Sequence, residues 1–407
     1  MNSRRILHVN RICYLDDSNG AAVSSRALLE VLQWQGFTVE ALTGSIIEVG
    51  EELNPASWLE SRGFAPSKRD FGYSATVDAR GVVEDNNVDH RVVNGVSATI
   101  LLGHPGRPGD PSDDECRDFL AWLDRTLDLF RPDVVVNFGG DRLSNAIRAT
   151  VRRAGIAVVF PLHNLSYDVR WPFDDVAAAL VPSRFAADHY RRTIGLECAV
   201  IPNPVEFGRA RATDHHPRYL TFVNPSPEKG VFVFARIADE LARTRPDIPF
   251  LVVEARGSER TLAECGLNLA RNGNISLMTH TSDPRQFWGV TKLCLMPSLC
   301  MESQGLVAVE AMINGIPVIG SDRGALPETL GNGGIALPLP DRLTPLTREL
   351  PTASQVTPWI KAIIDLWEDP SWLAERSHRA KREADRWAPE VLGPQYAQLF
   401  ANVRPLA

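Results

Sequence analysis

The chain has 407 residues, of which 44% are hydrophobic and 23% charged, so we expect a globular protein too long for a single hydrophobic core. Its net charge of −7 argues against a nucleic-acid-binding protein. No apolar run is long enough to cross a membrane and the amino terminus carries no signal-peptide pattern, so we expect a cytoplasmic location.

Predicted strands and helices alternate in the first half of the chain. Residues 5–10 form an apolar strand, and a helix over residues 21–35 ends at Gly36. Further strands are expected at 37–44, 132–140, 156–164 and 176–183, with a second helix at 142–153. Because such alternation produces parallel sheets covered on both faces, we expect a doubly wound sheet.

Residues 45–115 interrupt this pattern and are expected to elaborate the first domain. Asn94-Gly95 lies between two strand-like runs, which predicts a hairpin. Residues 45–89 are polar and show no period, so the sequence assigns them no function.

Four arginines lie along the predicted helix at 142–153: Arg142, Arg148, Arg152 and Arg153. We interpret them as a solvated helix face, because the stripe is short. A weak peripheral contact with the anionic inner face of a membrane stays open.

The second half repeats the plan. Strands are expected at 219–223, 248–257, 293–298 and 316–322, and a helix follows Gly230. The prolines of residues 196–207 indicate a linker, and a helix from Asp369-Pro370 precedes a short terminal one. We therefore predict domains at 1–196 and 197–385, with 386–407 crossing back to the first.

Residues 301–328 read MESQGLVAVEAMINGIPVIGSDRGALPE. Ser303 predicts an N-cap and a helix from about Gln304, with Glu302 just before it and Glu310 about two turns inside. The free N–H groups of a helix start attract phosphate, whereas carboxylates accept hydrogen bonds from hydroxyl groups. A nucleotide-sugar carries both kinds of group, which makes it the expected ligand.

Three stretches resemble the retaining glycosyltransferases of family 4. VIPNPVEF (200–207) resembles the family's linker, PSPEKG (225–230) its phosphate loop, and the segment from 297 to 328 its E-x7-E signature. The resemblance implies the GT-B fold, in which two doubly wound, Rossmann-like domains face each other across a cleft.

The resemblance also implies roles for individual residues. Glu302 would bind the transferred sugar, Glu310 the ribose, and Lys229 the diphosphate. The diphosphate would also meet the backbone of the helix start, at Ser303, Gln304, Gly305 and Leu306. In the first domain, Gly20 would let the backbone approach the donor, and His163 would contact its sugar.

The chain departs from the family pattern at three places. Asn224 stands where an arginine is usual, so Arg256 is a candidate for the missing charge. Gln304 replaces an aromatic residue, and Arg323-Gly324 replaces a Gly-Gly pair. These changes bear on the identity of the donor.

The sequence therefore predicts a retaining glycosyltransferase that moves a sugar from a nucleoside-diphosphate sugar to a polar sugar, glycoside or glycan. No metal-ligand cluster is visible and the six cysteines follow no zinc spacing, so we expect neither a metal nor another cofactor. Two alternatives remain: a nucleotide-sugar epimerase or hydrolase, and an inactive nucleotide-sugar-binding protein.

Overall fold

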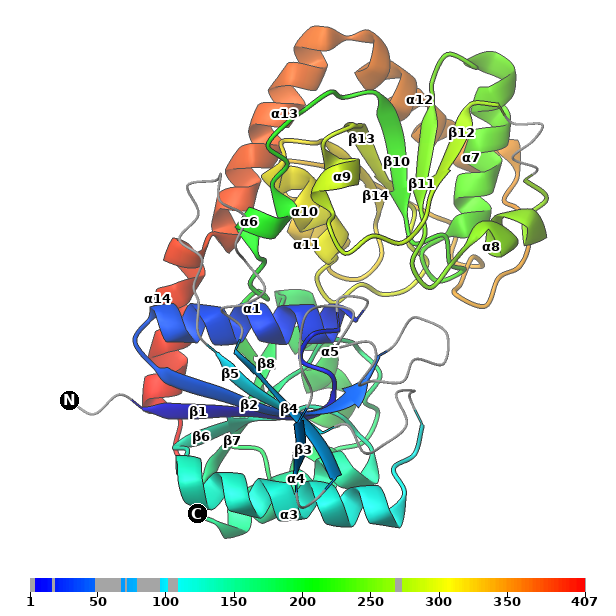
Figure 1. The fold of residues 1–407 in the computed structure, drawn as a ribbon. Helices are drawn as coiled ribbons and strands as arrows, with labels where there is room; N and C mark the ends of the chain where they lie inside the picture. Colours follow the sequence, from blue (N-terminus) through cyan, green and yellow to red (C-terminus); the bar gives the residue numbers. More distant parts are fainter. Residues whose placement is uncertain are drawn as a thin grey trace. The chain divides into compact units, whose positions relative to one another are not determined.

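The computed structural model describes residues 4–16, 19–47, 67–69, 72–78, 96–101, 109–267 and 273–406 (Figure 1). The chain divides into two compact units. Unit 1 contains Met1–Pro204 and Pro389–Ala407, and unit 2 contains Val205–Ala388. The divisions predicted from the sequence, at 196/197 and 385/386, lie eight and three residues earlier.

The described strands of unit 1 form one sheet in the order β3-β4-β5-β2-β1-β6-β7-β8-β9. Neighbours are parallel from β5 to β9, as the doubly wound pattern predicts, whereas β4 is antiparallel to both β3 and β5. The strands are β1 (Arg5–Ile12), β2 (Thr38–Ile46), β3 (Ser67–Arg69), β4 (Gly72–Asp78), β5 (Ser97–Leu101), β6 (Val134–Val136), β7 (Ala157–Pro161), β8 (Ala178–Val181) and β9 (Ala199–Val200).

Helices cover this sheet on both faces, with α1 and α3 on opposite sides in Figure 1. Helix α3 was not predicted from the sequence, although Ser112 caps it and three acidic residues fill its first turn. The predicted hairpin at Asn94-Gly95 lies outside the described residues. The helices are α1 (Gly20–Trp34), α3 (Asp113–Phe130), α4 (Arg142–Arg153), α5 (Arg184–Ile194) and α14 (Pro389–Asn402), with a 3₁₀ turn at Trp171–Phe173.

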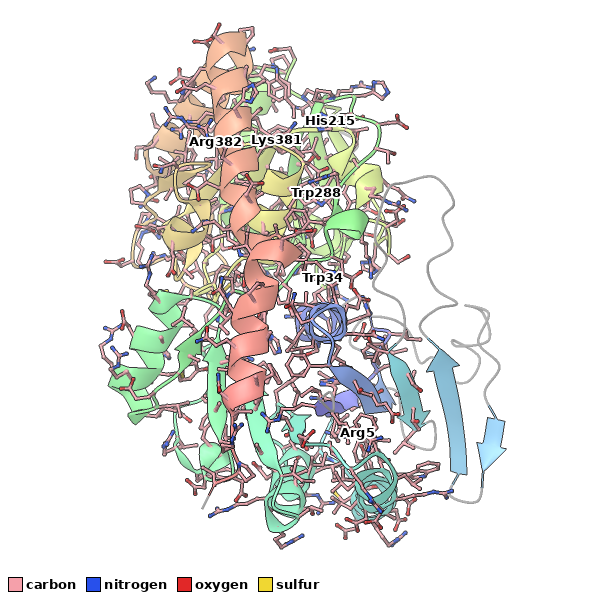
Figure 2. All side chains as sticks on the ribbon, turned by 90° about the vertical axis from the view of Figure 1, so that its left-hand side faces the viewer. Arg5, Trp34, His215, Trp288, Lys381 and Arg382 are labelled. Carbon is pink, nitrogen blue, oxygen red and sulfur yellow. The ribbon has the colours of Figure 1, made fainter. Side chains whose placement is uncertain are left out.

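The terminal helix α14 belongs to unit 1, where it packs against α1. Trp34, labelled in Figure 2, lies so close to Gly393 that a Cβ there would be 3.2 Å from the indole. The Arg4 guanidinium donates to the carbonyl of Val403 at 3.1 Å. These contacts join the two ends of the chain within one unit.

The arginines of α4 do not form a continuous solvated face. Arg148 is 1% exposed, and its guanidinium donates to Asn137 Oδ1 at 2.7 Å. Arg152 pairs with Asp175 at 2.9 Å, and Arg142 pairs with an aspartate of α3. The interpretation of Arg148 as a surface residue was therefore wrong, because its charge is used inside the unit.

Unit 2 contains a parallel sheet in the order β12-β11-β10-β13-β14-β15. The chain starts in the middle at β10, builds outward to β12, and then resumes on the other side of β10 with β13. Ligands of doubly wound sheets bind at the carboxyl ends of the strands where the order reverses, here β10 and β13. The strands are β10 (Tyr219–Val223), β11 (Phe250–Val253), β12 (Ile275–Met278), β13 (Thr291–Met296), β14 (Val318–Ser321) and β15 (Ile335–Leu337).

The apolar faces of the helices pack against this sheet and form the core of unit 2. The core of unit 2 includes Phe222, Phe234 and Phe250, which come from β10, α7 and β11. The ring of Phe234 stacks on that of Phe222 and meets that of Phe250 edge-on. The helices are α6 (Phe207–Ala210), α7 (Val231–Thr244), α8 (Glu259–Glu264), α9 (Arg285–Trp288), α10 (Leu306–Ile313), α11 (Leu326–Leu330), α12 (Ala353–Glu368) and α13 (Pro370–Ala384), with a 3₁₀ turn at Asp385–Trp387.

Candidate functional site

The loops that leave β10 and β13 meet at the carboxyl edge of the unit 2 sheet. The β10 loop brings Lys229, and the β13 loop brings Glu302. The backbone N–H groups of Leu299 and Cys300 both donate to the carbonyl of Glu228, at 2.8 and 3.0 Å. The two loops are thus joined directly beside the predicted residues.

Lys229 and Glu302 form an ion pair, with Nζ 2.6 Å from Oε1. The same oxygen accepts a bond from Ser298 Oγ at 2.8 Å and lies 3.6 Å from the thiol of Cys300. Sequence reasoning missed Ser298 and Cys300. A Ser two residues after the end of a buried strand and four positions before Glu302 was the available signal, but neither residue type marks a site by itself.

The charges of this pair stabilise each other. Burial alone would raise the pKa of Glu302, but the charge of Lys229 and bonds from Lys229, Ser298 and Cys300 hold it below the ordinary value. Burial alone would lower the pKa of Lys229, but the Glu302 carboxylate and the Cys300 sulfur raise it. Both groups therefore remain charged at neutral pH.

Two glycines allow the loops to approach so closely. Gly324 has φ 64° and pairs in a parallel bridge with Glu302, and a Cβ there would lie 2.4 Å from the Glu302 backbone. Gly230 has φ 82°, and its Cβ would lie 1.9 Å from the carbonyl of Pro297. The glycine of the Arg323-Gly324 step is therefore required by the backbone beside Glu302.

The helix after Glu302 begins later than predicted. Its N-cap is Gly305, in the left-handed region at φ 85°, and α10 starts at Leu306. The predictions of Ser303 as N-cap and of a start near Gln304 were therefore wrong. Gln304 is instead buried, and its carbonyl accepts a bond from Thr329. Within the described residues, the backbone N–H groups of Gly305 and Leu306 donate no hydrogen bond, which suits an anion.

Glu310 lies in α10 only a little more than one turn from its start, not two turns as predicted. Its carboxylate accepts a bond from the indole N–H of Trp288 at 3.2 Å, a partner that the sequence did not indicate. Burial raises the pKa of Glu310, against the opposing effects of Trp288 and of the Arg209 charge. A half-buried carboxylate is thus held in a fixed orientation.

The residues that depart from the family pattern have identifiable positions. Asn224 has φ 63°, and its Oδ1 accepts a bond from the backbone N–H of Gly257 at 3.0 Å. Arg256, the preceding residue, is exposed, and its positive charge lowers the pKa of Lys229 slightly, against the larger raising effect of Glu302. Arg323 donates to the carbonyls of Leu339 and Pro340, so its guanidinium holds a neighbouring loop.

The predicted residues of unit 1 lie at the carboxyl edge of its sheet. Gly20 is the exposed first residue of α1, and Asn19 caps that helix. His163 follows β7, and its ring meets Phe138 edge-on with centroids 4.8 Å apart. Burial lowers the pKa of His163 to about 4, and lowers that of His8 beneath the same phenylalanine to about 3. Both imidazoles are therefore neutral at physiological pH.

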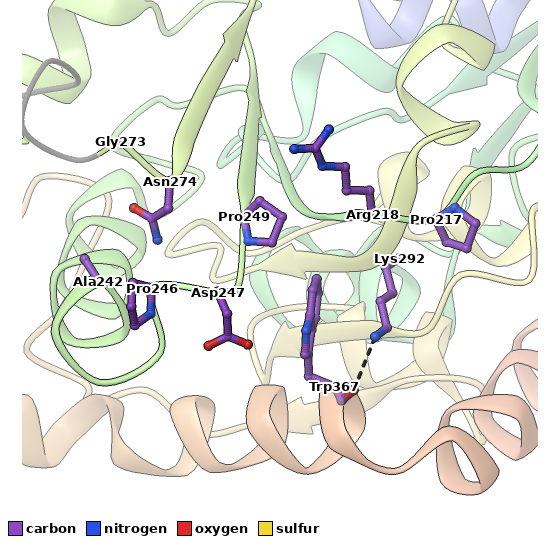
Figure 3. Close-up of a pocket in the computed structure, with 10 residues that line it drawn as sticks. All are labelled: Pro217, Arg218, Ala242, Pro246, Asp247, Pro249, Gly273, Asn274, Lys292 and Trp367. Atoms are coloured by element: carbon purple, nitrogen blue, oxygen red, sulfur yellow. Dashed lines mark hydrogen bonds between the residues drawn. The ribbon is translucent and has the colours of Figure 1, made fainter.

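A cavity of about 730 Å³ lies at the opposite, amino-terminal edge of the unit 2 sheet (Figure 3). Its polar groups are occupied by the protein: Lys292 donates to the Trp367 carbonyl at 3.2 Å, and Asp247 pairs with Arg245 at 2.7 Å. No predicted site residue borders it, so we place the site at the other edge. The lining consists of Pro217, Arg218, Ala242, Pro246, Asp247, Pro249, Gly273, Asn274, Lys292 and Trp367.

Three further observations concern the described part of the chain. It contains no group of three or more His, Cys, Asp or Glu side chains arranged to hold a metal ion. The six cysteines are free thiols. None of the described helices combines the length and the apolarity that crossing a membrane requires.

Residues 217–355 match the family model described as glycosyl transferases group 1. A phosphatidyl-myo-inositol mannosyltransferase of Mycolicibacterium smegmatis is 26% identical over 56% of this chain and 58% of its own length. A lipopolysaccharide 1,2-N-acetylglucosaminetransferase of Salmonella typhimurium is 25% identical over 49% of this chain and 57% of its own length. The chain thus spans a little over half the length of these curated relatives.

Solved structures resemble the chain over nearly its whole length. Sucrose-phosphate synthase of Thermosynechococcus elongatus has a TM-score of 0.67 at 15% identity, covering 98% of each chain. Anabaena HepE in complex with UDP and glucose has a TM-score of 0.65 at 15% identity, covering 98% of this chain and 99% of that one. These similarities confirm the predicted GT-B fold. Residues 217–355, which include the E-x7-E segment, are the part of the chain that is similar to the glycosyl transferases group 1 family.

Proposed function

We propose that this protein is a retaining glycosyltransferase that transfers a sugar from a nucleoside-diphosphate sugar to a carbohydrate acceptor. The observation that carries the proposal is the Lys229–Glu302 pair, which lies where the strand order of a group 1 domain reverses. The pair places a cation that can bind phosphate beside a carboxylate that can accept hydrogen bonds from hydroxyl groups.

Stabilisation of the leaving diphosphate is the main catalytic task in this proposal. Lys229 and Arg256 supply positive charge, and the N–H groups of Gly305 and Leu306 supply donors at the start of α10. In the proposed reaction these groups do the electrostatic work without a metal ion. Arg256 thereby takes over the charge that the family pattern places at the position of Asn224.

Recognition of the sugars falls to the two glutamates. Glu302 accepts a hydrogen bond from a hydroxyl group of the transferred sugar, and Glu310, fixed by Trp288, accepts from the ribose. Unit 1 offers two further groups to a ligand: the exposed backbone of Gly20 at the start of α1, and the neutral imidazole of His163 as a hydrogen-bonding partner for a sugar hydroxyl group.

The chemical step exchanges one bond at the anomeric carbon for another. The bond from this carbon to the phosphate oxygen breaks, and the acceptor oxygen forms its bond from the same face, so the configuration is retained. The acceptor proton passes to the departing phosphate oxygen. The anomeric configuration is thus retained without a nucleophilic side chain of the enzyme. Correct positioning of donor and acceptor lowers the activation barrier.

The acceptor in this proposal is a polar sugar, glycoside or glycan. Two relatives are named for a phosphatidylinositol and a lipopolysaccharide acceptor. In this chain, however, Arg148 is buried, and Arg142 and Arg152 pair with aspartates, so α4 offers an anionic lipid surface less free charge than its four arginines suggest.

Thermal-shift measurements with UDP-, GDP-, ADP- and CMP-sugars test the proposal, since a ligand that binds only the native state raises its apparent stability. We expect one nucleotide class to stabilise the protein and the matching sugar to be transferred only when a carbohydrate acceptor is present. Turnover of donor without acceptor would instead indicate the epimerase or hydrolase, and binding without any turnover the inactive protein.

A further inference from the structure

The two carboxylate oxygens of Glu302 have different surroundings. Oε1 lies within contact of three donors, from Lys229, Ser298 and Cys300, at 2.6, 2.8 and 3.6 Å. Oε2 contacts no donor among the described residues. Glu302 as a whole is only 8% exposed, and Oε2 is its one carboxylate oxygen to which no described residue donates a hydrogen bond.

The two neutral donors are themselves held in place. Ser298 is 1% exposed, and its carbonyl accepts a bond from Ser321 Oγ at 2.7 Å. The backbone N–H of Cys300 donates to Glu228 at 3.0 Å. Burial raises the pKa of the Cys300 thiol to about 12, so the thiol keeps its proton and can donate it to the carboxylate.

We propose that Ser298 and Cys300 are positioning residues which, together with Lys229, occupy Oε1 of Glu302 and so direct Oε2 to a hydroxyl group of the donor sugar. This inference rests on the proposed transfer reaction. It extends that proposal because it assigns a function to two residues and distinguishes the two oxygens of one carboxylate.

Two consequences follow from this arrangement. A carboxylate held at one oxygen accepts a hydroxyl group only from the direction of the other, so the site selects the position of that hydroxyl. The neutral donors also share the negative charge of Oε1 with Lys229. The ammonium has three N–H groups: one donates to Oε1 and one is directed to the Cys300 sulfur at 3.9 Å, which leaves one for the diphosphate.

The experiment compares Ser298→Ala and Cys300→Ala with wild type, and uses Ser298→Thr to restore the hydroxyl. Ser276→Ala, at an exposed serine, and Cys265→Ala, at a buried free thiol that bonds to the Thr261 carbonyl, are the controls. UDP and GDP probe the nucleotide part of the site, and UDP-glucose and GDP-mannose probe the whole donor. A ¹³C titration of the Glu302 carboxyl group gives a readout that needs no ligand.

We expect Ser298→Ala to lower kcat about tenfold, as for the loss of a hydrogen bond to a charged group, with the affinity for the free nucleotide unchanged. Cys300→Ala should show a smaller loss, because a thiol is a weak donor. Both should raise the pKa of Glu302, and Ser298→Thr should restore wild-type values. Activity in the controls should not change.

Unchanged kcat and an unchanged Glu302 titration in both alanine variants would overturn the inference. So would an equal loss of nucleotide affinity, stability and kcat, which indicates a purely structural role. Failure of the proposed function gives a different result: wild type would bind neither donor nor nucleotide, and Glu302→Gln would change nothing.

Discussion

Lys229 and Glu302 are 73 positions apart in the chain, yet their charged groups meet at 2.6 Å. The contact follows from topology, since β10 and β13 are neighbours and both loops emerge at the same edge of the sheet. It places a cation and an acceptor side by side before any ligand arrives. Such preorganisation spares the site the cost of assembling charges when the donor binds.

Replacing Lys229 by Met should weaken nucleoside-diphosphate binding about tenfold or more, because a charge-assisted hydrogen bond contributes about 1.5–3 kcal/mol. The free energy of unfolding should fall by less than the about 3–5 kcal/mol of a fully buried pair. Solvent already screens Lys229, which is 29% exposed. Calorimetry and urea denaturation measure the two effects. Lys229→Arg keeps the charge as control, and unchanged affinity in Lys229→Met would remove this loop from the site.

The Glu302 pair should make stability depend on pH at the acidic end. The folded-state pKa of Glu302 lies below its ordinary value of 4.5. Its contribution is therefore fully present above pH 4.5 and is lost as the pH falls through the lowered folded-state pKa. Melting curves of wild type and Glu302→Gln should converge across that range. A constant difference down to pH 3 would show that the pair adds no pH-dependent stability.

Elements with strong local signals could be predicted from the sequence. The strand expected at 219–223 coincides with β10, and the helix at 142–153 coincides with α4, which Asp141 caps. Periodicity and capping act within a few residues, so they are visible without tertiary contacts. The signal for α3 is equally local, in Ser112 and the acidic turn after it, although no helix was predicted there.

The detailed geometry of the site depends on contacts between distant segments. Ser303 has the right chemistry for an N-cap, but the bridge from Glu302 to Gly324 fixes the loop so that Gly305 becomes the cap. No local propensity contains that bridge. The contacts of Ser298 with Glu302 and of Trp288 with Glu310 likewise join side chains whose residue types alone mark no site.

Gly324→Ala should displace Glu302. The added Cβ would lie 2.4 Å from the backbone N and O of Glu302, and φ at this position is 64°. The matched control is Gly266→Ala, because Gly266 has φ 79° but nothing within 4 Å of the added atom. Strain at a positive φ costs about 1–3 kcal/mol in both variants. Only Gly324→Ala should also lose kcat, and equal activity of the two would contradict this account.

Transfer should continue in EDTA. The reason is that Lys229, Arg256 and the start of α10 together supply positive charge for the diphosphate in the proposed reaction. In other enzymes a divalent ion supplies this charge. Initial rates measured with EDTA, and again after adding Mg²⁺ or Mn²⁺, should agree within about twofold, well below the tenfold that 1.4 kcal/mol would produce. Complete loss of activity in EDTA, restored by either ion, would show that a metal does this work.

Hydrogen exchange should separate the donor site from the cavity at the opposite edge. Nucleoside diphosphate should slow exchange in residues 224–230 and 302–310, because its phosphates contact the β10 loop and the start of α10. The cavity segments around Asn274 and Lys292 should exchange as before, since their polar groups are already bonded within the protein. Adding a carbohydrate acceptor should then slow exchange in the segment that follows β7 and contains His163.

Lys229→Met serves as control, because it should reduce the protection by nucleotide and leave the cavity segments unchanged. Protection by nucleotide at Asn274 and Lys292, without protection at 302–310, would move the donor site to the amino-terminal edge and refute the assignment made from the order of the strands.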